Sequence, residues 1–251
     1  MGALKRFLNY SYEPFRLHFC GPQDEATAKI VEDYLVGKRI SPVRLAKIAE
    51  QFVGVYPYLK LIARKNNLHP LDEKVIEAYW LGNDLLKQVT ADDLKKLIKE
   101  DFVGPGKLSL AQVEKLAHHL PERSLAHHSF HVFYVGSVTQ TVILAGKLLD
   151  LCRVGWGKII EERQLKDELR ILIRYRPLIV RVNEIRLSKD EAEKEIKWNQ
   201  KILPKAMTGQ IISFHWDLAA EVLSEDQAHW LEKVTIRNIE AVNTNKLRIY
   251  G

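Results

Sequence analysis

Cysteine and histidine are the side chains of this sequence best suited to chemistry. The chain has two cysteines, Cys20 and Cys152, and nine histidines, and three of those stand close together in the phrase His127-His128-Ser129-Phe130-His131. His127 and His131 are four residues apart, a spacing that places both imidazoles on one face of a helix, as a pair of metal ligands requires. On a strand they would also share a face. His127, His128 and His131 are therefore candidate metal ligands, and buried histidines that bond to the backbone are the alternative.

Of the two cysteines, Cys20 is the less informative. Cys20 follows His18 by two residues, so the two are a possible ligand pair, but they lack the repeated spacing that is typical of a zinc site. We interpret residues 1–23 as an irregular segment that its aromatic side chains hold against the core. Pro14 and the turn-like pair Gly21-Pro22 favour this interpretation.

Cys152 opens a stretch in which the sequence pattern changes from helical periodicity to strand-like alternation. It is followed by Gly157, Lys158, Ile159, Ile160 and Glu161. A second distinctive stretch, residues 209–228, begins with Gly and a polar residue, continues as a strand to His215, and leads through an apolar run into an acidic helix start. In this order the two stretches resemble the HypC family of nickel-iron hydrogenase maturation chaperones, over residues 151 to about 243.

The resemblance implies two metal ligands, Cys152 and His215. Proteins of that family carry iron bearing CO and cyanide, which is built on a HypD partner and handed to the hydrogenase large subunit. A soft thiolate and a neutral imidazole suit such iron. The resemblance also makes five neighbouring residues candidates for contact with a partner: Trp156, Gly157, Lys158, Trp216 and Asp217. The alternatives are a cysteine buried as a small hydrophobe and a histidine that ends a strand between two aromatic residues.

The sequence departs from the family in three respects. Cys152 is internal, so it has no free α-amine, whereas the family cysteine becomes N-terminal after removal of Met. Trp156 stands where the family usually has Pro. The span from Cys152 to His215 is longer than in the family, and we expect a loop around residues 189–194 to absorb the difference.

The remaining pattern predicts an α+β protein in two parts. Residues 1–150 are expected to form an all-α domain of unknown role, because Asp24, Ser41-Pro42 and Thr90 are good helix starts and Gly54 is a good stop. Helices are predicted at 24–37, 42–54, 56–65, 70–83, from Thr90 onward, at 109–120 and at 138–151. Residues 151–251 are expected to form a small barrel of the OB type, with a final helix from Ser224 to about Ala241. Residues 77–83 and 127–133 also resemble an uncharacterised family associated with hydrogenase loci.

Composition limits the choice of function. The net charge of +6 permits an acidic partner, but most basic residues alternate with acids, so nucleic-acid binding is not expected. No run of apolar residues is long enough to span a bilayer, the start does not resemble a secretory signal, and two cysteines make no disulfide framework. We expect a cytoplasmic protein with no membrane partner.

Our first hypothesis is a hydrogenase maturation accessory protein, a carrier or chaperone rather than an enzyme. It would bind or recognise an iron centre and dock a HypD-like scaffold or a hydrogenase large subunit. The alternatives are a metal-free interaction module and a metalloenzyme that uses the histidines of the helical domain. The sequence leaves open whether the two parts share one site at their junction.

Overall fold

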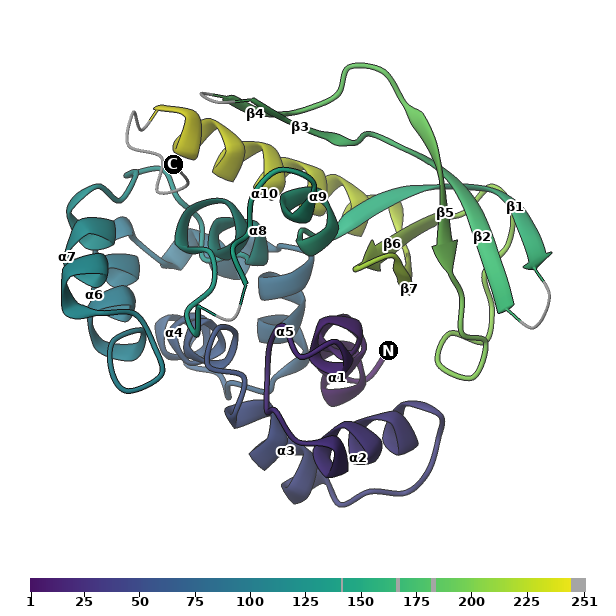
Figure 1. Cartoon of the computed structure of the whole chain (residues 1–251), viewed down its shortest axis with the longest axis horizontal. Coiled ribbons are helices and arrows are strands. Elements are labelled where there is room, and N and C mark those ends of the chain that lie inside the picture. The colour runs from purple at the N-terminus through teal and green to yellow at the C-terminus, as the bar shows by residue number, and fades with distance from the viewer. Residues whose placement is uncertain (141, 166–167, 182–183, 245–251) are drawn as a thin grey trace.

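The computed structural model describes residues 1–140, 142–165, 168–181 and 184–244, and it confirms the predicted α+β class. Helices make up the first part of the chain, a closed five-stranded barrel follows, and a long helix ends the described chain (Figure 1). None of the described helices is both long enough and apolar enough to cross a bilayer.

Local capping explains where most helices start. The side chains of Asp24, Asp72, Thr90 and Ser109 each accept a hydrogen bond from a backbone N–H in the first turn, and Pro42 occupies the first turn of its own helix. The helices are α1 (Ala3–Arg16), α2 (Glu25–Leu35), α3 (Pro42–Glu50), α4 (Tyr56–Asn66), α5 (Glu73–Trp80), the 3₁₀ helix η1 (Asp84–Gln88), α6 (Ala91–Asp101), α7 (Leu110–His118), α8 (His128–Phe130), the π turn η2 (His131–Val135), α9 (Lys147–Cys152) and α10 (Glu225–Thr244).

The barrel has the connectivity of an OB-like fold. Its strands are β1 (Gly155–Leu165), β2 (Glu168–Tyr175), β5 (Ala192–Lys197), β6 (Ile211–His215) and β7 (Leu218–Leu223). They close in the order β1-β2-β5-β7-β6, and every pairing is antiparallel except that of β5 with β7. Alternate side chains fill the interior, among them Ile159, Ile173 and Phe214. Gly157 allows β1 and β2 to approach, since a Cβ atom there would lie 2.6 Å from the carbonyl oxygen of Arg174.

A hairpin that is not part of the barrel lies between β2 and β5. It consists of β3 (Leu178–Arg181) and β4 (Glu184–Leu187), and it packs on α10, where the side chain of Asn243 bonds to both backbone groups of Ile185. The expectation of a charged turn at residues 189–194 was wrong in part, because strand β5 already begins at Ala192. The hairpin lies between Cys152 and His215 in the sequence, so it contributes to the long span between these two residues.

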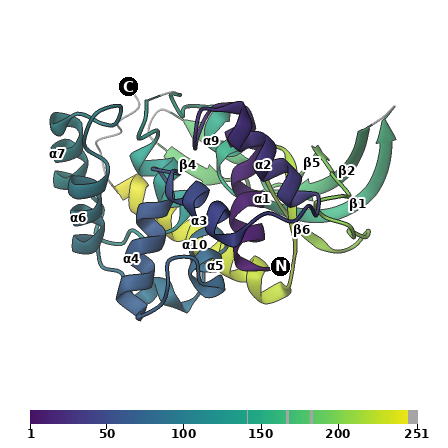
Figure 2. The same ribbon diagram turned by 90° about the horizontal axis from the view of Figure 1, so that it is seen from below.

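One buried core connects the helical part and the barrel. The cluster that contains Phe7 and Tyr10 of α1 continues through α5 to Leu218 of β7 and to Leu231 and Val234 of α10. Helix α1 lies against one end of the barrel, beside β6 and β7 (Figures 1 and 2). The site described below is at this contact.

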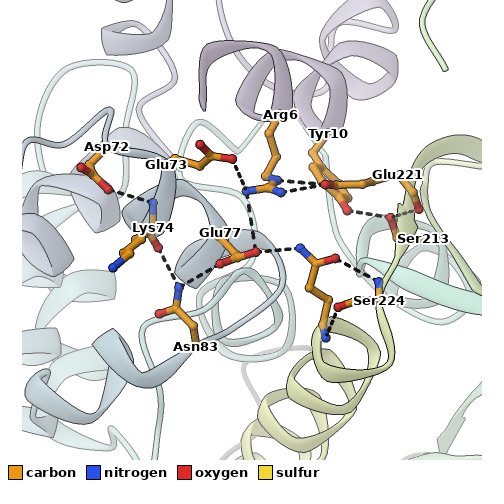
Figure 3. A network of polar contacts seen from close by, with 11 residues as sticks. Arg6, Tyr10, Asp72, Glu73, Lys74, Glu77, Asn83, Ser213, Glu221 and Ser224 are labelled. Atoms are coloured by element: carbon orange, nitrogen blue, oxygen red, sulfur yellow. Dashed lines mark hydrogen bonds and ion pairs between the residues drawn. The ribbon is translucent and has the colours of Figure 1, made fainter. Parts of the chain in front are cut away.

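A buried ionic network fixes α1 against the barrel. The Arg6 guanidinium makes two hydrogen bonds to the Glu221 carboxylate, at 2.7 and 2.9 Å, and lies 3.8 Å from Glu77 of α5. Further along α1, the Tyr10 hydroxyl is 2.6 Å from the hydroxyl of Ser213 on β6 (Figure 3). Two positions one turn apart on α1 are therefore held by neighbouring strands.

Two predictions of secondary structure were wrong. Residues 3–16 form helix α1 rather than an irregular segment, with Pro14 inside the helix. The helix predicted for 138–151 is confined to α9, Lys147–Cys152, and the described residues between Gly136 and Gly146 are not helical.

Candidate metal centre

Three potential metal ligands meet at the junction of the helices and the barrel. His128 comes from α8, Cys152 ends α9, and His215 ends β6. One ligand atom of each lies within 4.8 Å of those of the other two, so the group could hold a metal ion. Cys152 and His215, the residues that the HypC resemblance marks, therefore come together, and His128 joins them from the histidine cluster.

Backbone contacts set the positions of the three residues. His127 caps α8 by accepting the N–H of Ser129 at 3.0 Å, which fixes the start of the helix that carries His128. The N–H of Trp216 donates to the carbonyl of Leu151 at 3.0 Å, so the end of β6 is tied to α9. The position of His128 thus depends on a local cap, and the positions of Cys152 and His215 depend on a backbone contact between α9 and the end of β6.

His215 lies between two backbone carbonyl groups. Its Nδ1 atom is 2.6 Å from the carbonyl oxygen of Tyr10, and its Nε2 atom is 2.6 Å from that of Cys152. A neutral imidazole has a single N–H, so only one of these contacts is a hydrogen bond, and in the other contact two lone pairs face each other. A cation at Nε2 relieves that repulsion while Nδ1–H donates to Tyr10, which is the usual arrangement for a histidine ligand.

Pro14 explains why the carbonyl of Tyr10 is open to His215. In an α-helix the N–H of residue 14 donates to the carbonyl of residue 10, but proline has no N–H. Pro14 lies inside α1, so the Tyr10 carbonyl lacks this intrahelical donor. Pro14 makes the helix hard to predict from the sequence, and the same residue leaves the carbonyl of Tyr10 available to His215.

His128 has a partner that suits either of its neutral tautomers. Its Nε2 atom is 2.8 Å from the carbonyl oxygen of Cys152, and its Nδ1 atom is 3.1 Å from the hydroxyl of Tyr79. That hydroxyl is also 3.4 Å from the carbonyl oxygen of Gly54. Tyr79 can donate to Nδ1, or it can accept from Nδ1–H and donate to Gly54, and the second arrangement leaves the Nε2 lone pair for a metal.

Burial makes the metal-free group electrically neutral. It raises the pKa of the Cys152 thiol to about 12, an effect that the Trp216 side chain partly offsets. Burial lowers the pKa of His215 to about 4, and burial together with the neighbouring histidines lowers the pKa of His128 well below its ordinary value. At pH 7 a metal must displace the thiol proton, which costs on the order of 7 kcal/mol. Zinc binding to zinc-finger peptides releases roughly 10–16 kcal/mol, so a thiophilic metal can meet this cost.

A cavity of about 70 Å³ borders the group. Its described walls carry no Asp, Glu, Lys or Arg, and the indole nitrogen of Trp80 has no hydrogen-bond partner among the described residues. One thiolate with two imidazoles suits zinc, iron, cobalt or copper(I) rather than magnesium or calcium. The cavity has room for a metal ion and roughly one or two small ligands.

The other two histidines of the cluster do not belong to this group. The ring nitrogens of His127 contact the hydroxyl of Ser129 at 2.8 Å and the carbonyl of Trp80 at 3.2 Å. His131 borders the cavity, and its Nδ1 atom is 3.4 Å from the hydroxyl of Tyr58. His127 and His131 thus follow the alternative interpretation, that of buried histidines held by protein partners.

The residues expected to contact a partner lie in two places. On β1, Lys158 is exposed, Trp156 is partly buried under the Arg153 guanidinium, and Gly157 is buried. Trp216 and Asp217 form the turn between β6 and β7, with φ values of 52° and 58°. Trp216 is buried and stacks on Phe19, with ring centroids 4.5 Å apart, while Asp217 pairs with Lys194. Of the five, Trp216 belongs to the cavity wall.

Three contributors were not predicted from the sequence. Tyr10 and Tyr79 act through contacts between segments that are distant in the chain, which no local spacing reveals. Cys20, which we interpreted as packing, borders the same cavity as Cys152. A single cysteine and tyrosines within helices are too common to indicate a site without the fold.

Comparison with known proteins gives one family and no function. No curated protein and no solved structure matches the chain. A family profile described as a family of unknown function, DUF6390, matches residues 2–248, a range that includes the helical part, the barrel and all three ligand residues. The chain belongs to the DUF6390 family.

Proposed function

We propose that this protein is an accessory factor in the maturation of nickel-iron hydrogenase, which holds iron at His128, Cys152 and His215 and passes it to a partner. The observation that carries the proposal is the meeting of Cys152 and His215. These residues are 63 positions apart, yet the Nε2 atom of His215 lies 2.6 Å from the Cys152 carbonyl. They are the two residues that the HypC resemblance marks as ligands. His215 ends strand β6 of the OB-like barrel, and Cys152 ends the helix that leads into strand β1.

His128 compensates for the main departure from that family, which is the internal position of Cys152. An internal cysteine has no α-amine beside it, and His128 supplies a nitrogen donor at that place. Three protein ligands leave a position open on a four-coordinate metal, as transfer to another protein requires.

The cavity suits iron that carries diatomic ligands. Its apolar walls accept CO, and the indole N–H of Trp80, which has no partner among the described residues, is a donor for the nitrogen of a cyanide ligand. Partners would be a HypD-like scaffold or the hydrogenase large subunit. Of the expected contact surface on β1, the exposed Lys158 and the partly buried Trp156 are accessible to such a partner.

The test is an infrared spectrum of the full-length protein, purified anaerobically together with a HypD-like scaffold. The proposal predicts bands from bound CO and cyanide that are lost in Cys152→Ala and in His215→Ala. His131→Gln is the matched control, since His131 borders the same cavity outside the ligand group. A stable complex whose spectrum has no such bands would replace this proposal with a metal-free docking module.

A further inference from the structure

Cys20 is a second thiol in the cavity of the candidate metal centre. It belongs to the segment between α1 and α2, and both its side chain and that of Cys152 border the cavity. Cys20 lies outside the tight group of three, so its thiol must rotate, or its segment must shift inward, to reach the same ion.

Contacts on either side of Cys20 hold it over the cavity. Phe19 stacks on Trp216, the neighbour of His215. Gly21 has a φ of 78° and packs so closely on Phe52 that a Cβ atom would lie 2.6 Å from its ring. The backbone N–H of Cys20 donates to the carbonyl of Pro14 at 3.4 Å. The thiol is therefore placed by the fold and is not on a free loop end.

Charge balance indicates why a second thiol matters. A divalent cation bound by one thiolate and two neutral imidazoles keeps a net charge of +1. No acidic residue is among the described residues that line the cavity, so no carboxylate there neutralises this charge. An unbalanced charge in a buried site is strongly penalised. A second thiolate makes the complex neutral and completes a tetrahedral set of two sulfur and two nitrogen ligands.

We propose that Cys20 is the fourth ligand for a thiophilic divalent cation that arrives without anionic ligands of its own, such as Fe²⁺, Co²⁺ or Zn²⁺. This rests on the metal-holding role proposed above and adds to it the ligand set for a bare ion, which is Cys20, His128, Cys152 and His215. Iron that brings cyanide carries its own negative charge and needs no second thiolate. Three ligands come from the packed core, and the fourth comes from the segment after α1. Displacement of Cys20 alone reopens the position through which the ion is passed on.

The test is anaerobic titration of the reduced full-length protein with Co²⁺ alone. X-ray absorption counts the sulfur ligands, and the near-ultraviolet sulfur-to-cobalt absorption measures the same quantity in solution. The expected result is two sulfur ligands in the wild type. In Cys20→Ala we expect one sulfur ligand, about half of the charge-transfer absorption and affinity lower by at least about tenfold. His131→Gln should give the wild-type spectrum, and a thermal melt without metal checks that each variant is folded.

The possible outcomes separate the two proposals. One sulfur ligand in the wild type, with an unchanged spectrum in Cys20→Ala, would overturn the role of Cys20 and leave the three-ligand centre standing. Failure of the wild type to bind Co²⁺ at all, in a folded and reduced state, would overturn the metal-holding role itself, and the role of Cys20 with it.

Discussion

The Nδ1 atom of His215 lies 2.6 Å from the carbonyl oxygen of Tyr10, and this contact joins the first helix of the chain to the candidate metal centre. Because the partner is a backbone atom, no substitution of Tyr10 removes it directly. It depends instead on the position of α1 and on the missing N–H of Pro14, and both can be tested.

Pro14→Ala should raise stability and lower metal affinity together. The new N–H can donate to the Tyr10 carbonyl, which restores a helix bond worth up to about 3 kcal/mol relative to proline. The same carbonyl then holds His215 less firmly, and loss of such outer contacts typically lowers metal affinity about 10- to 100-fold. Urea unfolding and Co²⁺ titration measure the two effects. Pro57→Ala, in the first turn of α4, is the control and should leave metal affinity unchanged. Equal affinity in both variants would argue against the role of Pro14.

Arg6→Ala should strongly destabilise the protein. The substitution leaves the buried carboxylate of Glu221 without its partner, which typically costs about 3–5 kcal/mol. Lys29→Ala is the contrasting control, because the exposed pairs of Lys29 with Glu32 and Asp33 are screened by solvent and are expected to contribute little. Chemical denaturation gives both values. The double change Arg6→Met with Glu221→Leu should recover much of the loss, and a small effect of Arg6→Ala would mean that water reaches Glu221.

Tyr79→Phe should weaken metal binding more than it weakens the fold. The hydroxyl is the Nδ1 partner of His128, so its loss is expected to lower affinity about 10- to 100-fold while unfolding free energy changes by about 1 kcal/mol. Tyr58→Phe makes the same change beside His131, which is outside the ligand group. If the two variants bind Co²⁺ equally, the tautomer of His128 is not set by Tyr79.

Metal affinity should rise with pH between about pH 6.5 and 8.5. The pKa of Cys152 is raised to about 12, so the thiol is protonated throughout this range and each bound ion must release its proton. Apparent affinity then increases about tenfold per pH unit for one thiol and about a hundredfold if Cys20 is also a ligand. Competition with a chelator of known proton uptake measures the slope. A slope of zero would show that no thiol is deprotonated on binding.

The metal-free protein should lose stability as the pH falls below about 6.5. Burial lowers the pKa of His127 to about 3 and that of His131 and His215 to about 4. The unfolded chain therefore binds protons that the folded chain excludes, and unfolding free energy falls by roughly 1.4 kcal/mol per pH unit for each such histidine until the folded pKa is reached. His127→Gln should remove one proton from this slope. An unfolding free energy independent of pH from 6.5 to 4.5 would contradict the burial of these groups.

The fold was largely predictable because its signals are local. Caps such as Asp24 and Ser109 mark helix starts through bonds within three residues, and the alternation after Val154 marks the first barrel strand. Helix α1 was missed for a physical reason. Proline normally ends a helix, and only contacts made by Phe7, Tyr10 and Phe15 with distant segments explain why Pro14 is tolerated inside one.

The candidate site was predictable only in part. Cys152 and His215 could be marked by resemblance, whereas the choice of His128 over His127 and His131 could not be made from spacing. A pair four residues apart requires a regular helix, but α8 spans only His128–Phe130 and passes into a π turn at His131. The irregular backbone turns the three rings toward different partners.

Because its proposed ligands come from the segment after α1, from α8, from α9 and from β6, the centre has a consequence for biosynthesis. A nascent chain contains Cys20, His128 and Cys152 before the ribosome has added His215, and His215 is aligned only once β6 has paired in the barrel. On the proposed role, no ion is held by all of these ligands until the barrel has formed. Occupancy of the centre would then report that the barrel is folded, and copies that end before β6 would be left without cargo.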